Sequence, residues 1–189
     1  MEVQATMQIS QASMTVIRGE TVRPGLEQIF LSHKDLIFRA AYRITGNASD
    51  AEDVLQTVFL RLVRQEDISA INNLPGYLHR SAVNAALDLL RSRKDAQTVS
   101  LDADPHQMEA VSLDTAARVT ELRDWLRQAL ARINPKWAEM FVLRFVEDLS
   151  NREIAGLMKT SPAVVAVVLH RTRALLKKDF KSVKARGTR

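Results

Sequence analysis

The sequence predicts an all-α fold, in which two small helical domains are joined by a flexible linker and the C-terminal domain is a helix-turn-helix. Apolar residues recur at three- and four-residue steps along most of the chain, and no segment has the alternating pattern of a strand. Between Asp95 and about Asp114 the helical pattern is also absent, and this segment is the predicted linker. With 189 residues, of which 46% are hydrophobic and 26% charged, the chain can bury one modest core or two small ones.

Three helices are expected in the first domain. The first spans about residues 26–44 and stops at the Gly-Asn pair of "TGN". The second opens with Ser49, three residues before Glu52, which is the spacing of a capping box, and it runs through "DAEDVLQTVFLRLVRQ". The third begins near "NLPGYLHRS", where Pro75 suits the first turn, and continues to about Lys94.

Four helices are expected after the linker. Two cover residues 115–133 and 135 to about 147, and a short third helix opens with Ser150, with Glu153 completing a second capping box. The last opens at Ser161-Pro162 after the turn "MKTSP" and ends in a basic run, so the final pair forms a helix-turn-helix.

These helices divide the chain into five predicted segments. Residues 1–23 form an N-terminal extension, either disordered or a short extra helix, and residues 24–95 form the first domain. Residues 96–114 are the linker, residues 115–182 the second domain, and residues 183–189 a basic tail.

Composition argues against several functions. Cysteine is absent, the four histidines have no second metal ligand at a suitable spacing, and phosphate loops and catalytic sets are missing. We therefore expect no cofactor, no metal site, no catalytic residue and no enzyme activity. The N-terminus lacks a signal-peptide pattern and no stretch is long enough to span a bilayer, which predicts a cytoplasmic protein without membrane insertion.

Charge is concentrated at the C-terminal end. Eight Lys or Arg against one Asp lie in residues 170–189, whereas the rest of the chain is net negative. Such a patch indicates either nucleic acid or another polyanion as a partner, or a solvated tail.

Two helices of the first domain carry polar faces. The second helix presents Asp53, Gln56 and Leu60 opposite its apolar stripe, either as solvated surface or as a docking face for another protein's helix. On the third helix, residues at steps of four, four and three form a face that can hold nucleic acid or remain a polar surface with one ion pair. These residues are Arg80, Asn84, Asp88 and Arg91.

The last helix is apolar where a reading helix should meet bases. If Val165, Val168, Leu169, Thr172 and Leu176 pack inward, the outer side holds Ala163, Ala166, Val167, His170, Arg171, Arg173 and Lys177. Alanine and valine methyls can touch a thymine methyl but neither donate nor accept a hydrogen bond, so direct readout by the start of this helix should be weak.

The motifs "RITGNASDAEDVLQTVFLRL", "LPGYLHRSAVNAALDLLRSRK", "LRQALARINPKWAEMFVLRFVEDLSNREIAGLMKTS" and "LHRTRALLKK" resemble the extracytoplasmic-function (ECF) sigma factors, small two-domain initiation subunits of bacterial RNA polymerase. The resemblance covers about residues 25–180. It implies that Glu52, Asp53 and Gln56 bind core polymerase, on the docking face where Leu60 would be an apolar anchor. It also implies that the third helix meets the melted promoter element through Asn84, Asp88 and Arg91. Residues 68–75 would hold a flipped base in this comparison.

We expect upstream duplex DNA to lie against Arg152, Ala163, Val167, His170, Arg171, Arg173 and Lys177. The family commonly has polar residues where this chain has the apolar run 164–168, so contacts of that run do not carry over, whereas His170 and Arg171 match later contact positions.

The predicted function is a sigma factor that binds core RNA polymerase and promoter DNA, directs recognition, melting and initiation, and is held by an anti-sigma protein. The alternative is a sigma-like protein that acts through protein contacts alone, by titrating or mimicking a partner. A free-standing helix-turn-helix repressor is a third class, but it leaves the faces of the first domain without a role.

Overall fold

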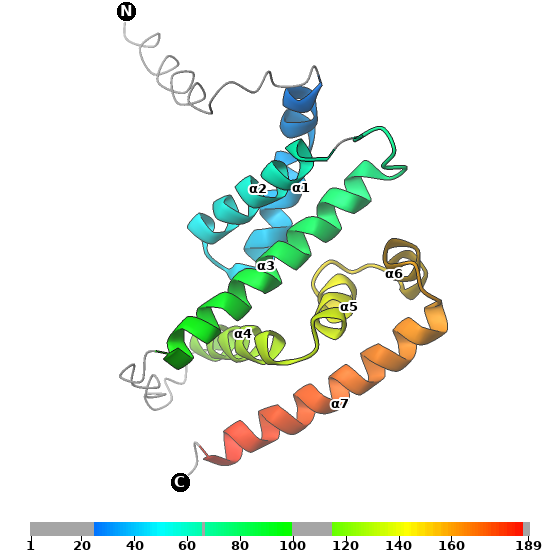
Figure 1. The fold of residues 1–189 in the computed structure, drawn as a ribbon. Coiled ribbons are helices and arrows are strands. Elements are labelled where there is room, and N and C mark those ends of the chain that lie inside the picture. Colours follow the sequence, from blue (N-terminus) through cyan, green and yellow to red (C-terminus); the bar gives the residue numbers. More distant parts are fainter. Residues whose placement is uncertain (1–24, 66, 100–114, 187–189) are drawn as a thin grey trace, which may run out of the picture. The chain divides into compact units, whose positions relative to one another are not determined.

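The computed structural model describes residues 25–65, 67–99 and 115–186 (Figure 1), and in these residues it contains seven helices and no strand. The helices are α1 Leu26–Thr45, α2 Ala48–Val63, α3 Leu74–Val99, α4 Thr115–Arg132, α5 Pro135–Phe145, α6 Asn151–Met158 and α7 Pro162–Arg186. The all-α prediction is confirmed. The predicted N-terminal extension, residues 100–114 of the predicted linker and the end of the basic tail lie outside the described residues.

The chain divides into a unit of residues 1–32, whose described part is the beginning of α1, and a unit of residues 33–189. Within the second unit, α3 packs against α2, α4, α5 and α6, while α7 packs against α5 and α6. The largest fully buried side chains of this unit are Ile37, Leu62, Leu78, Leu87, Leu143, Ile154, Val54, Val58, Val83, Val142, Val165 and Thr172.

Local signals set most helix ends. Gly46 has φ 70°, the left-handed conformation that ends α1. The capping box of Ser150 and Glu153 opens α6 as predicted. Ser49, however, does not cap α2: the N-cap is Asn47, whose side chain accepts from the backbone N–H groups of Ser49 and Asp50. The prediction was wrong because Asn caps as well as Ser does and stands closer to the glycine stop.

Helix α3 continues past its predicted end at Lys94 as far as Val99. The added residues, "DAQTV", carry no apolar stripe, but extending an existing helix requires only one further residue to be ordered for each new hydrogen bond. In the described residues no single helix is long and apolar enough to cross a membrane. Only α6 and α7 taken as a pair reach that length and composition, and the two are bent by 106°.

Candidate nucleic-acid interface

The first half of the polar face of α3 lies against α5. Arg80 Nε donates to Oε1 of Glu139 at 2.5 Å, and Asn84 Nδ2 donates to the same oxygen at 3.1 Å. Arg80 also donates from Nη1 to the carbonyl of Leu157 in α6 at 3.0 Å. Arg80 and Asn84 are half-buried on this face, because a buried carboxylate requires charged or hydrogen-bonding partners and takes these two.

The second half of the same face is less occupied. The exposed Asp88 accepts from Arg91 Nη1 at 2.9 Å, which is the pair expected from their spacing. The other two guanidinium nitrogens of Arg91, Nε and Nη2, are buried and have no hydrogen-bond partner among the described residues. Buried donors without an acceptor are costly, so Arg91 is suited to a phosphate or base oxygen.

The loop before α3 is organised by short polar contacts. Asp67 Oδ1 accepts from the backbone N–H of Ser69 at 2.9 Å and from its hydroxyl at 2.5 Å. Asn73 Oδ1 accepts from the backbone N–H of Gly76 at 3.0 Å, and its neighbour Asn72 is exposed. The amides of this loop have the donors and acceptors that a base edge requires, and the role of residues 68–75 stays a prediction.

Helix α2 turns its acidic face to solvent. Glu52, Asp53 and Gln56 are all exposed, and Leu60 is an exposed apolar side chain beside them. On the opposite side Asp50 is buried and forms a bidentate ion pair with Arg93 of α3. This pair and the apolar stripe hold α2 on α3, and the acidic face is directed outward.

The two helices of the helix-turn-helix are separated by a tight turn in which Lys159 adopts φ 52°. Helix α7 then begins with Ser161 Oγ accepting from the backbone N–H of Val164 at 3.3 Å. Four of the five residues predicted to pack inward are buried, and Val168 is half-buried.

All seven residues predicted on the outer side of α7 are exposed, namely Ala163, Ala166, Val167, His170, Arg171, Arg173 and Lys177, and Arg152 of α6 is exposed as well. The guanidinium of Arg173 also lies 5.6 Å from the ring centroid of Phe145. The outer side thus begins apolar, with Val167 50% exposed, and becomes cationic from Arg171 onward.

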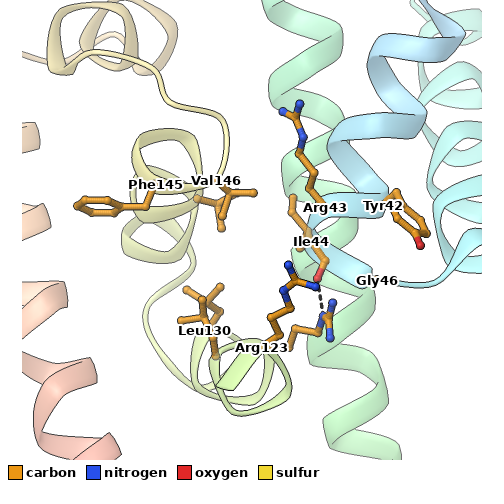
Figure 2. A pocket seen from close by; sticks show the side chains of 11 residues that line it. Tyr42, Arg43, Ile44, Gly46, Arg123, Leu130, Phe145 and Val146 are labelled. Atoms are coloured by element: carbon orange, nitrogen blue, oxygen red, sulfur yellow. Dashed lines mark hydrogen bonds between the residues drawn. The ribbon is translucent and has the colours of Figure 1, made fainter. Parts of the chain in front are cut away.

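A cleft of about 530 Å³ lies between the C-terminal end of α1 and helices α4 and α5 (Figure 2). Three guanidinium groups, those of Arg43, Arg123 and Arg127, line it together with apolar side chains such as Leu130 and Val146. Arg127 Nε donates to the carbonyl of Ile44 at 3.0 Å. A methyl group on Gly46 would overlap the Arg127 side chain, so the glycine leaves room for this contact.

Sequence reasoning missed the two glutamates of this region. Glu139 stands inside an apolar stripe of α5, between Ala138 and Met140, and its side chain is buried. Glu147 follows α5 and accepts through Oε2 from Arg43 Nη1 at 3.1 Å, while His79 Nε2 lies 2.7 Å from the same oxygen. A charged residue in an apolar stripe was the one available signal, since it indicates a partner elsewhere in the chain.

Two family models match the chain. Sigma-70 region 2 covers residues 29–96 and Sigma-70, region 4 covers residues 123–176. The first region includes all of α2 and most of α3, and the second includes α5, α6 and the beginning of α7.

Curated relatives cover most of the chain. The ECF RNA polymerase sigma factor SigE of Mycolicibacterium smegmatis is 29% identical over 84% of this chain and 62% of its own length, so this chain spans less than two thirds of that relative. SigW of Bacillus subtilis is 27% identical over 80% and 86% of the two chains. The RNA polymerase sigma-E factor of Streptomyces coelicolor is 30% identical over 82% and 85%.

A similar fold occurs in the structure of CnrH in complex with the cytosolic domain of CnrY. The TM-score is 0.51, the sequences are 20% identical, and the match covers 83% of this chain and 88% of the other. At this identity the likeness concerns the fold of the helices.

Proposed function

This chain belongs to the extracytoplasmic-function family of RNA polymerase sigma factors, and we propose that it acts through three of its helices, with one contact surface on each. As a sigma factor it binds core RNA polymerase and directs it to promoters, where initiation follows. The order of the two matched regions carries this assignment of contact surfaces to helices. Helices α2 and α3 begin within the first matched region and α7 begins within the second, and these helices bear the predicted contact residues.

Helix α2 is the proposed polymerase-binding helix. Its face of Glu52, Asp53 and Gln56 is charged and polar, and Leu60 adds a half-covered apolar anchor at its C-terminal side. An exposed leucine in a polar surround is typical of a contact that completes its burial in a partner.

Helix α3 and residues 68–75 are the proposed site for the melted promoter strand. Asn84 can offer a donor and an acceptor to a base edge, Arg80 and Arg91 can neutralise phosphate, and Asp88 orients Arg91. A base removed from the duplex loses a few kcal/mol of stacking and pairing, and the loop would have to supply a comparable gain.

Helix α7 is the proposed duplex-binding helix. Its basic residues, with Arg152, would bind phosphates, while Ala163 and Val167 offer only methyl contacts to the bases. We therefore expect the upstream element to be recognised mainly through charge and DNA shape, with sequence choice made at α3.

We propose the same domain bounds as the sequence predicts, with residues 24–95 and 115–182 as the two functional domains. The role is regulatory and non-enzymatic, its place is the cytoplasm where polymerase acts, and an anti-sigma protein is the expected inhibitor.

Multi-round transcription from a pool of genomic promoter fragments tests the proposal. Purified core polymerase should yield discrete new transcripts only when this protein is added, and their upstream elements should show a relaxed consensus. Stable binding to core without transcripts would instead favour the alternative of a sigma-like protein that acts through protein contacts, for which the exposed Val164 and Val167 would be the docking surface.

A further inference from the structure

We propose that the cleft between the C-terminal end of α1 and helices α4 and α5 binds a small phosphorylated molecule. The ligand class is a phosphate group attached to an apolar or flat organic body, such as a nucleoside or an acylated glycerol. None of the surfaces assigned to polymerase or promoter DNA includes the residues that line this cleft. Figure 2 shows Arg43 on the α1 side, with Val146 and Leu130 on the opposite side.

The cleft has the size and the apolar lining of a small-molecule site. Its volume is about 530 Å³, and pockets for small ligands usually enclose about 300–1,000 Å³. Among its lining residues, Ile44, Leu130 and Val142 are buried, whereas Leu126 and Val146 are half-buried. An organic body lying against these last two side chains would remove their remaining apolar surface from water, which favours binding.

Three guanidinium groups line this apolar cleft, and the acids that balance them are few. No aspartate or glutamate is among the described residues that line it. Asp124 pairs with Arg127 at 2.6 Å, but the side chain of Asp124 is itself 57% exposed, so water weakens this pair. Glu147 pairs with Arg43 at 3.1 Å. Like charges gathered beside apolar side chains repel one another, so an anion that enters the cleft is attracted to it.

The arginines differ in the donors that they can offer to a phosphate. Arg123 is exposed and has no hydrogen bond or ion pair in the part of the chain that the structure describes. Arg43 donates to Glu147 through Nη1, and among the described contacts its Nε and Nη2 are left for a second acceptor. Arg127 is held in place, because its Nε donates to the carbonyl of Ile44 at 3.0 Å. Guanidinium donors of this kind suit the several oxygens of a phosphate.

Residues of both matched regions contribute to the cleft. Arg43 and Ile44 lie in the residues matched by Sigma-70 region 2, whereas Arg123 and Arg127 lie in those matched by Sigma-70, region 4. A bound molecule would therefore contact both regions at once. The cleft would give this sigma factor a small-molecule ligand in addition to polymerase and DNA.

Calorimetric titration of the full chain tests the proposal with two phosphorylated probes, adenosine triphosphate and dihexanoyl phosphatidic acid below its micelle-forming concentration. Each is compared with an inorganic anion that lacks the organic body, tripolyphosphate for the nucleotide and phosphate for the lipid. At least one probe should bind about tenfold more tightly than its inorganic counterpart, because only the probe can cover the apolar wall. The probe that does so identifies the source of the ligand. If neither does, the proposal is wrong.

Arg123→Gln and a matched control show whether the arginines of the cleft hold the phosphate. Arg123→Gln should weaken binding of the preferred probe about tenfold, because a charge-assisted hydrogen bond is lost. Arg118→Gln removes the same charge from an exposed position of α4 that does not line the cleft, and it should stay within about twofold of wild type. Equal losses in the two variants would reflect net charge alone and would overturn the proposal.

Nuclear magnetic resonance of isotope-labelled protein locates the bound probe. The backbone amide signals of Gly46, Leu126 and Val146, which line the cleft, should shift as the probe is added. Shifts confined to the basic side of α7, at Arg171 and Arg173, would place the probe on the proposed DNA-binding helix and contradict the proposal. These experiments contain neither polymerase nor DNA, so their failure leaves the proposed function intact, and absence of transcription leaves their result intact.

Discussion

Leu60 offers a quantitative test of the polymerase-binding face. Its side chain is 46% exposed on the outer side of α2. Burying a whole leucine side chain is worth about 1.5–3 kcal/mol, so covering the exposed half in a complex is worth about 1 kcal/mol. Because about 1.4 kcal/mol corresponds to a tenfold change in Kd, Leu60→Ala should weaken binding to core polymerase about fivefold.

The assay is an equilibrium titration of the protein, labelled at its N-terminal amine, with purified core polymerase. Leu122→Ala is the matched control, because Leu122 is 47% exposed on α4 and lies outside the proposed contact surfaces. Both substitutions remove a similar exposed apolar surface, so a loss specific to Leu60 reports contact with polymerase. If both variants bind within about twofold of the wild-type protein, the reasoning about α2 is wrong.

Three further predictions address DNA binding, packing and pH. Val167→Ser should change the preference for the upstream element little, whereas Arg171→Ala should weaken promoter binding clearly. Titrations at several salt concentrations should show that Arg171→Ala also reduces the salt dependence of binding by about one phosphate contact. A large loss of binding from Val167→Ser alone would contradict this expectation. Leu143→Ala should lower the free energy of unfolding in urea by about 2–5 kcal/mol, because Leu143 is completely buried; an unchanged midpoint would show that the core is not as described. Hydrogen bonds with Ser150 lower the pKa of Glu153, the side chain of Ser150 having the larger effect and its backbone N–H the smaller. These bonds therefore stabilise the folded protein above the pKa that Glu153 has in the unfolded chain. The stabilisation is lost as the pH falls through the lowered pKa of the folded protein. The stability of Glu153→Gln should therefore respond less to acid than wild type does, and an identical pH profile would contradict the capping role.

Local chemistry explains why most helix boundaries could be predicted. The capping box at Ser150 and the glycine stop at Gly46 act within a few residues, so the sequence displays both partners side by side. The same locality explains the error at α2, where Asn47 and Ser49 are both able to cap and only the backbone geometry selects Asn47.

Periodicity also predicted which side of α7 would be buried, because a single apolar stripe can face only one core. Val165, Leu169 and Leu176 are buried and Val167 is exposed, as the pattern indicates. The weak hydrogen-bonding capacity at the start of this helix therefore follows from the residue types and their spacing. The family resemblance likewise follows from motifs in the chain, and the region matches support it.

The amino-acid sequence by itself determined the helices, their apolar faces, the helix-turn-helix and the membership of the sigma factor family, since these depend on neighbours three or four residues apart or on motifs in order. Only the tertiary structure decided that the polar face of α3 is partly occupied. Glu139 lies 59 residues from Arg80 and 55 from Asn84 along the chain. A buried charge is stable only when hydrogen-bonding or oppositely charged partners satisfy it. Here the partners lie far away in the sequence, and no local pattern identifies them.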